Sequence, residues 1–321
     1  MKSFFTKTTF NAVGKILKDT FTGFMDDKAL KLSAALSYYT LFSLGPLLLL
    51  MISVAGIFLG DEAVRGHLFG EINGLLGNQA AAQVQDTIKN LELSGKSNTA
   101  VIIGAVTLLI GATTVFGEIQ DSINIIWRVK AKPKRGWVKL LKDRLLSSSL
   151  IVALGFLLIV SLIVNGTLKA LNEWLIARFP DVTIILFSAI DFIVSFVVIS
   201  LLFGTIFKVL PDVKIAWKDV RTGAFFTACL FMFGRYLIGL YLETTGTAST
   251  YGAAGSVIII LVWVYYTAAI MYLGAEFTRA YANYSGLRIQ PADYAVYVEQ
   301  TEREINATQV PLGEKKKITI D

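Results

Sequence analysis

The sequence has very few of the residues that bind metals or form disulfides. Its 321 residues include one cysteine, Cys229, and one histidine, His67. A single cysteine excludes a disulfide within the chain, and together the two residues leave no His/Cys cluster of the kind that holds zinc. No GxxxxGK[ST] phosphate-binding loop is present either, so ATP-driven transport by this chain alone is not expected. We therefore expect no metal site, no cofactor and no catalytic residue.

Charge is also scarce. Asp, Glu, Lys and Arg make up 17% of the chain, whereas hydrophobic residues make up 54%. This composition is too apolar for an ordinary soluble globule, and it predicts a membrane protein. The first thirty residues lack a short apolar core followed by a small-residue cleavage site, so no cleavable signal peptide is expected.

The most apolar feature is an uncharged stretch over residues 32–60. As a helix it would be about 43 Å long at ~1.5 Å per residue, enough to cross a hydrocarbon core of ~30 Å. Residues 47–59 are almost pure hydrocarbon, but the first half carries several hydroxyls, including those of Tyr38 and Tyr39. That half is predicted to face other helices or a wet cavity. Pro46 lies between the halves and predicts a bend, because proline removes a helical hydrogen bond.

Five further apolar stretches predict five more spans, at about residues 97–117, 145–168, 182–207, 222–242 and 256–275. The segments around the spans contain 6, 3, 8, 2, 4, 0 and 6 Lys and Arg residues in chain order. Positively charged segments stay in the cytoplasm, so this alternation places both termini there. We expect a multi-pass protein of the bacterial cytoplasmic (inner) membrane, with its basic loops against anionic lipid headgroups.

The predicted fold is therefore all-α, a polytopic membrane protein with a bundle of six transmembrane helices over residues 32–276. Residues 1–31 form a cytoplasmic amphipathic segment, since apolar residues recur there every three or four positions. This helix either lies among the headgroups or packs on the cytoplasmic end of the bundle. Short helices are expected in the first outer loop, at about 62–76 and 79–92. Residues 277–321 form a cytoplasmic tail whose end is expected to be disordered.

Two opposite charges lie within predicted spans, Asp191 in the fourth and Arg235 in the fifth. Their depths agree within ~2 Å at the rise of an α-helix, so they are predicted to pair. Ser188 and Ser195 extend a polar stripe on the same helix face as Asp191. The pair is either a charged station in a substrate or ion path, or a structural link between adjacent helices.

The sixth span carries Tyr265 and Tyr266 near its midplane, where tyrosine hydroxyls need hydrogen-bond partners. They indicate a polar lining, or alternatively hydrogen bonds that hold helices together. Glu118 and Glu276 each end a span after small residues. They are predicted to approach one another, or the same cation, at a cytoplasmic mouth. The alternative is that the charges there only set orientation and contact headgroups.

Four segments carry a resemblance to a known family: AALSYYTLFSLGPLLLL (34–50), FGEIQDSINIIWRVK (116–130), VLPDVKIAWKDVRTGAFFTA (209–228) and YGAAGSVIIILVWVYYTAAIMYLGAEFTRAYA (251–282). Together, and in this order, they resemble the YihY/BrkB family of bacterial inner-membrane proteins, historically labelled ribonuclease BN. The resemblance covers about residues 10–285. It implies six membrane helices with both ends cytoplasmic, and it transfers no catalytic residue.

The ribonuclease label is the least favoured function, since RNA hydrolysis needs an activated water or an acid–base pair that RNA can reach. The carboxylates of Glu118 and Asp121 in the second loop could bind Mg²⁺, but nothing else in the sequence supports such a site. No nucleic-acid partner is expected. The polar half-spans favour a transporter, channel or lipid translocator with a polar path lined by the first, fourth, fifth and sixth helices. The alternative is a non-transporting membrane scaffold or envelope-integrity protein.

Overall fold

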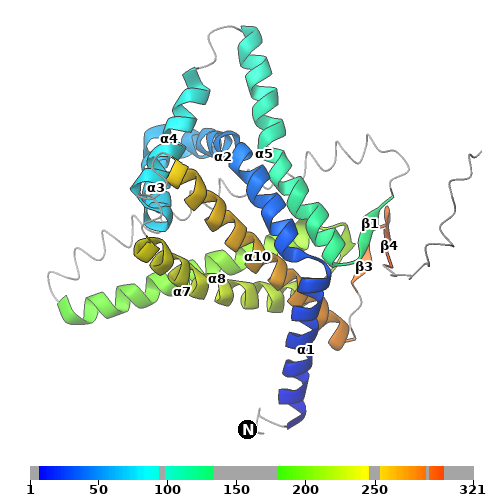
Figure 1. Ribbon diagram of the computed structural model, residues 1–321. Helices are drawn as coiled ribbons and strands as arrows, with labels where there is room; N and C mark the ends of the chain where they lie inside the picture. The colour runs from blue at the N-terminus through cyan, green and yellow to red at the C-terminus, as the bar shows by residue number, and fades with distance from the viewer. Residues whose placement is uncertain (1–6, 94–97, 133–179, 246–253, 287–288, 300–321) are drawn as a thin grey trace, which may run out of the picture.

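The computed structural model describes residues 7–93, 98–132, 180–245, 254–286 and 289–299. Most of these residues are helical, as the sequence predicted (Figure 1). Three of the described helices are long and apolar enough to cross a membrane, within Ala29–Leu49, Phe192–Val209 and Gly255–Tyr284. The predicted span at 145–168 lies outside the described residues, so the count of six stays a prediction.

The N-terminal half consists of two long helices and a helical hairpin. α1 (Lys7–Asp26) is followed after two residues by α2 (Ala29–Leu59), which continues as a helix through Pro46. α3 (Asp61–Leu76) and α4 (Asn78–Leu93) then form the hairpin. The two short helices predicted after the first span are thus confirmed, with ends within two residues of the expected ones. The bend at Pro46 stays a prediction.

The remaining helices are arranged around α10 (Gly255–Tyr284), which contacts α1, α2, α5 (Asn98–Ile126) and α8 (Trp217–Thr245) (Figure 1). α7 (Pro180–Val209) packs against α8. Phe196 of α7 meets Phe225 of α8, and Phe203 meets Phe231. α10 thereby occupies the centre of the described bundle.

Four short strands correct the all-α expectation. β1 (Val129–Ala131) pairs antiparallel with β4 (Ala295–Tyr297), and β2 (Val213–Lys214) pairs with β3 (Gln290–Pro291). Strands of two or three residues are too short to show the alternation that predicts a strand, which is why the sequence missed them. The pairs join the ends of α5 and α7 to residues 289–299, which return to the bundle after α10.

Antiparallel helices α8 and α10 approach closely because glycine faces threonine twice. A Cβ on Gly223 would lie 1.7 Å from the Thr278 Oγ1 atom, and one on Gly274 would lie 1.8 Å from the Thr227 Oγ1 atom. Both hydroxyls donate within their own helices, Thr227 to the Gly223 carbonyl and Thr278 to the Gly274 carbonyl, each at 2.7 Å. The contact is therefore tight and has its polar atoms satisfied.

Two apolar clusters divide the bundle into two ends. The larger cluster lies where the beginnings of α2 and α8 meet the ends of α5, α7 and α10, and we call this the charged end because of the side chains described below. The smaller cluster joins α3 and α4 to Leu48 and Ile52 of α2 and to Ile259 and Ile260 of α10. We call this the hairpin end.

Candidate functional site

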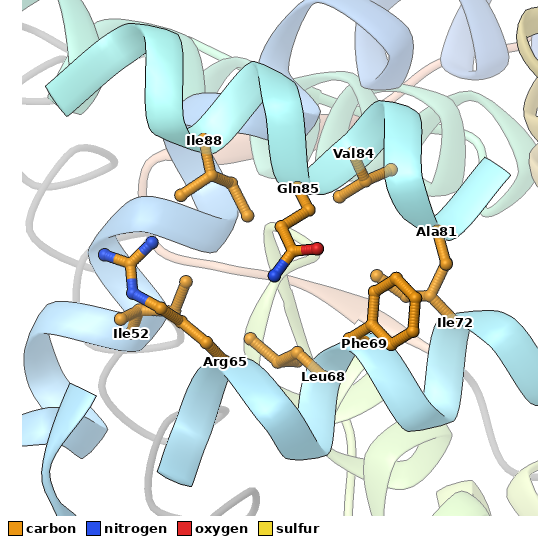
Figure 2. A pocket seen from close by; sticks show the side chains of 9 residues that line it. All are labelled: Ile52, Arg65, Leu68, Phe69, Ile72, Ala81, Val84, Gln85 and Ile88. Carbon is orange, nitrogen blue, oxygen red and sulfur yellow. The ribbon is translucent and has the colours of Figure 1, made fainter. Parts of the chain in front are cut away.

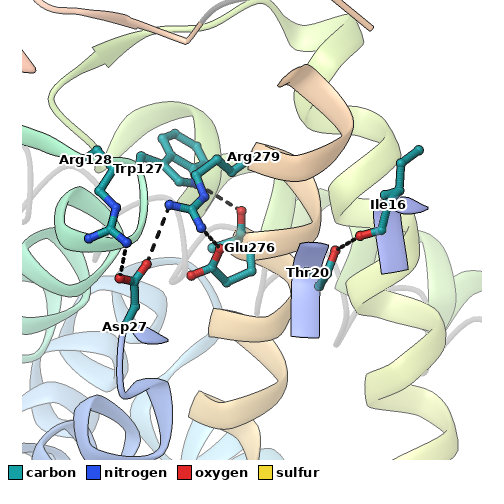
Figure 3. A network of polar contacts seen from close by, with 8 residues as sticks. Ile16, Thr20, Asp27, Trp127, Arg128, Glu276 and Arg279 are labelled. Atoms are coloured by element: carbon teal, nitrogen blue, oxygen red, sulfur yellow. Dashed lines mark hydrogen bonds and ion pairs between the residues drawn. The ribbon is translucent and has the colours of Figure 1, made fainter. Parts of the chain in front are cut away.

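Four charged side chains meet at the charged end: Asp27 between α1 and α2, Arg128 after α5, and Glu276 and Arg279 on α10 (Figure 3). We call them the four-charge cluster. Asp27 Oδ1 lies 2.6 Å from Arg128 Nη2, and Asp27 Oδ2 lies 3.6 Å from Arg279 Nη1. Glu276 Oε2 lies 2.7 Å from Arg279 Nη2. One aspartate therefore links three segments that are far apart in the sequence.

Burial makes these charges interdependent. The side chains of Asp27 and Glu276 are 0% exposed, whereas those of Arg279 and Arg128 are 18% and 29% exposed. Two negative charges and two positive charges balance, so the cluster has no net charge when all four groups are ionised. A buried charge that loses its partner is strongly destabilising, at about 3–5 kcal/mol. The cluster is therefore held together as a unit.

The backbone around the four-charge cluster is unusual at two positions. Lys28 and Arg128 have φ angles of 53° and 58°, in the left-handed region that non-glycine residues rarely adopt. Each of these two residues directly follows a residue that makes a buried polar contact at or beside the cluster. Asp27 precedes Lys28, and Trp127, which precedes Arg128, donates its Nε1–H to the Ala275 carbonyl at 3.0 Å. Backbone strain of this kind is often found at functional sites.

Helix α1 reaches the four-charge cluster because residue 23 is a glycine. A Cβ on Gly23 would lie 2.5 Å from Arg279 Nη2 and 2.6 Å from Glu276 Oε2. Any larger side chain would push the ion pair of Glu276 and Arg279 away from α1. Nothing in the sequence pointed to this contact, because α1 and α10 lie at opposite ends of the chain.

The two residues predicted at the cytoplasmic mouth, Glu118 and Glu276, lie on different helices, α5 and α10. Glu118 lies one residue beyond the predicted second span, and partial burial raises the pKa of its carboxyl, with a further increase from the charge of Asp121. Glu276 lies in the four-charge cluster. A direct approach of the two glutamates stays a prediction.

A second buried carboxylate, Asp212, was missed by sequence reasoning. It lies between α7 and α8, it is 2% exposed, and it accepts hydrogen bonds from Gln120 Nε2 at 3.2 Å, Asn124 Nδ2 at 2.9 Å and the Tyr294 hydroxyl at 3.0 Å. Its backbone N–H donates to Asn124 Oδ1 at 2.9 Å. We call this the Asp212 hub. The only signal was two amides four residues apart, just beyond the predicted second span, and an aspartate that follows a proline in a predicted loop.

The predicted intramembrane pair is only partly described. The side chains of Asp191 and Ser188 lie outside the described residues, although both residues are helical in α7. Ser195 is half-buried, and Arg235 is exposed on α8. The packing of α7 against α8 is compatible with an ion pair between Asp191 and Arg235. The pair itself stays a prediction.

The tyrosines predicted to line a polar path differ in exposure. Tyr38 and Tyr39 are exposed on α2, and their rings pack edge to face. Tyr265 and Tyr266 are half-buried on α10. The buried hydroxyls of the same half of α2 are serines, and Ser33 Oγ donates to the Ala29 carbonyl at 2.8 Å. A role of the four tyrosines in lining a polar path stays a prediction.

The hairpin end contains a small hollow of about 20 Å³ between α3 and α4 (Figure 2). Most of its lining is apolar, including Leu68, Val84 and Ile88, with Ile52 of α2 beside them. Arg65 and Gln85 also border it (Figure 2). Among the described residues, no three His, Cys, Asp or Glu side chains gather as metal ligands would.

The sequence is similar to a known family and to several of its curated members. The profile of a family described as "Virulence factor BrkB" matches residues 20–295. A UPF0761 membrane protein of Alkalilimnicola ehrlichii is 26% identical over 277 residues, covering 84% of this chain and 58% of the relative. One from Verminephrobacter eiseniae is 27% identical over 252 residues, covering 77% and 57%.

A UPF0761 membrane protein of Vibrio vulnificus is 25% identical over 256 residues, covering 76% of this chain and 75% of the relative. The chain thus spans little more than half the length of the first two relatives and about three quarters of this one. No solved structure gives a significant match.

Proposed function

Because the chain belongs to the BrkB family of membrane proteins, we propose that it moves a solute, an ion or a lipid across the bilayer, and that the four-charge cluster closes one end of the path. The observation that carries the proposal is the burial of Asp27 and Glu276, two carboxylates with 0% exposed side chains, where several helices meet. Ionisable groups inside membrane proteins are rare, and they mark substrate paths and proton relays.

The proposed topology has six spans, with both termini and the charged end in the cytoplasm. The alternating Lys and Arg counts support it. The packing is compatible with it, since the beginnings of α2 and α8 and the ends of α5, α7 and α10 share one apolar cluster. Reporter fusions after Gly60 and Leu242 should be external, whereas a fusion after Gly117 should be internal. The opposite pattern would exclude this topology.

The proposed gate works through the shared partners of Asp27. Arg128 belongs to the segment after α5, and Arg279 belongs to α10, so a separation of these elements would break at least one ion pair of Asp27. A substrate that supplied compensating charges or hydrogen bonds would lower the free-energy cost of that separation. The polar path beyond the gate would be lined by α2, α7, α8 and α10, which carry Tyr38, Asp191, Arg235 and Tyr266.

Flux from reconstituted liposomes tests the proposal. Wild-type protein should release a trapped ion or solute, or move a labelled lipid between leaflets, faster than empty liposomes do. Asp27→Asn should change that flux, because it weakens the contacts that close the gate. Asp293→Asn is the matched control, since Asp293 also forms an ion pair, with Lys214, but is 87% exposed. Equal effects of the two variants would exclude the four-charge cluster as a gate.

The second candidate is a membrane scaffold that transports nothing. The Asp212 hub favours it, because it joins α5, the α7–α8 connection and Tyr294 by hydrogen bonds to one carboxylate. Folded protein with no flux of ions, solutes or lipids in the liposome assay would favour the scaffold.

We further propose that the protein is not a ribonuclease, since RNA hydrolysis needs an activated water or an acid–base pair, and the sequence offers only two carboxylates one helical turn apart on α5, Glu118 and Asp121, as a starting point. RNA should remain intact when it is incubated with detergent-purified protein and Mg²⁺. Cleavage that disappears in Glu118→Ala would overturn this.

A further inference from the structure

Helix α1 has two apolar faces, and the described bundle covers only one of them. Ile16, Thr20 and Phe24 are buried at 7%, 2% and 8% exposure, on the side that packs against α10 and α2. Val13, Leu17, Phe21 and Met25 are 49%, 44%, 63% and 54% exposed. These four residues recur every four positions and therefore form one stripe along the helix, which we call the α1 stripe.

The α1 stripe lies between the bundle and a basic edge. At ~100° per residue, it occupies the sector next to the buried face, and Lys18 and then Lys15 follow on its far side. Both lysines are exposed. An apolar stripe with lysines along its outer edge is typical of helices that lie in the surface of an anionic membrane. Lysine stems can also run along apolar surface while the ammonium group reaches the headgroups.

The position of α1 in the chain brings the α1 stripe to the membrane. Only Asp27 and Lys28 separate α1 from α2, which begins a candidate span at Ala29. Asp27 is fixed by Arg128 and Arg279, so the junction between the two helices is held in place. The end of α1 is therefore within two residues of the start of a candidate span.

We infer that α1 is a membrane-surface helix, with the α1 stripe inserted among the lipids of the leaflet where α2 begins and with Lys15 and Lys18 bound to anionic headgroups. Lipid fits this surface better than a protein partner does, because the stripe adjoins a candidate span and lysines border its free side. The acidic residues Asp26 and Asp19 lie beyond those lysines, farther from the stripe. This inference does not depend on whether the protein transports anything.

Site-directed spin labelling of the full chain tests the inference. Cys229 is replaced by serine, and single cysteines are placed at Phe21 in the α1 stripe or at Thr22, its exposed neighbour outside the stripe. In liposomes of phosphatidylcholine and phosphatidylglycerol, a label at 21 should collide more with oxygen than with a water-soluble nickel chelate. A label at 22 should show the reverse. These two positions differ by one residue, so the fold, reconstitution and labelling are matched.

Each alternative occupant of the α1 stripe gives a different result. If the labels at 21 and 22 are equally accessible to the nickel chelate, the α1 stripe is exposed to water. An immobile label shielded from both reagents would mean a protein cover, and dipolar coupling between labels would identify it as a second copy of the chain. Either result would overturn the inference.

The lysines provide a second test of the same inference. Removing phosphatidylglycerol, or changing Lys15 and Lys18 to glutamine, should shift the label at 21 towards water. We expect the ratio of lipid-inserted to water-exposed label to fall roughly five-fold for each lysine replaced. Lys214→Gln, in the α7–α8 connection, is the control and should leave the ratio unchanged. A ratio that does not respond to either change would exclude anionic headgroups as the partner.

Discussion

The two ends of the bundle are held together by different kinds of interaction. At the charged end, Asp27 and Asp212 each accept contacts from several elements, and nearly every contact has a defined direction. At the hairpin end, α3 and α4 are packed on α2 and α10 mainly through aliphatic side chains, with a hollow between them. Directional contacts permit few arrangements, whereas apolar packing permits many of similar energy.

This difference separates fixed structure from adaptable structure within one protein. The proposed opening of the charged end would have no stable intermediate, because partly separated ion pairs would leave buried charges without partners. The hairpin end can repack gradually, since its contacts are short-range and non-directional. The following predictions test that contrast, beginning with the largest expected effect.

The largest effect is expected from Arg279→Leu. This change leaves Glu276 without its 2.7 Å partner and Asp27 with Arg128 alone, so it should lower the free energy of unfolding by about 3–5 kcal/mol. Thermal unfolding in detergent measures it. A matched change at an exposed ion pair, Lys214→Leu, should have little effect. The combination Arg279→Leu with Glu276→Leu should recover part of the loss, and a loss that is simply additive would contradict the pairing.

An effect of similar size is expected from Asp212→Ala, which removes the acceptor of the Asp212 hub. Buried Gln120 and Asn124 would each lose a hydrogen-bond partner, at about 1–3 kcal/mol. Hydrogen exchange should accelerate in residues 289–299, since Tyr294 also loses its partner and the Ala292 N–H bonds the Asp212 carbonyl. Exchange in α3 and α4 should not change. Faster exchange throughout the chain would show that the two ends are not separable.

At the hairpin end, Ile88→Val should lower the free energy of unfolding by about 0.5–1.5 kcal/mol, near the lower limit, because the side chain already borders a hollow. Ile123→Val at the charged end is the matched control, since Ile123 is fully buried in the larger cluster. The control should lose more stability. Equal losses, measured by thermal unfolding, would mean that the two clusters are packed equally well.

The smallest effect concerns pH. The pKa of Glu118 is raised in the folded protein, so the folded state binds more protons than the unfolded state just above pH 4.5. Stability therefore decreases as the pH rises through that window, and the penalty persists at pH 7. Glu118→Gln should remove this component, so the variant should lose less stability than wild type between pH 4.5 and pH 7. A variant with an unchanged pH profile of thermal unfolding would show that Glu118 is solvated.

The sequence predicted the elements whose signals are local. The bounds of α3 and α4 were close because Gly60 precedes α3 and Gly77 separates it from α4, and both glycines adopt positive φ angles outside the helices. Glu276 was identified as a candidate because a carboxylate at the end of an apolar span is unusual. Its cluster partner Asp27 was not identified, since it lies among other charges in the N-terminal segment and only the tertiary fold buries it. The Asp212 hub and the strands were missed for similar reasons, because their partners are distant in sequence and the segments are short.

The contact between α8 and α10 has a consequence for how the molecule can move. Gly223 and Gly274 each receive a threonine from the opposite helix, so the two helices engage at two points in opposite senses. A slide along the axis in either direction would drive a threonine hydroxyl into main-chain atoms, whereas a small rotation about the contact would not. The two helices can therefore rotate slightly about this contact, but they cannot slide past each other. Because α10 also carries Glu276 and Arg279, any rotation of α10 would move the arginine that contacts Asp27.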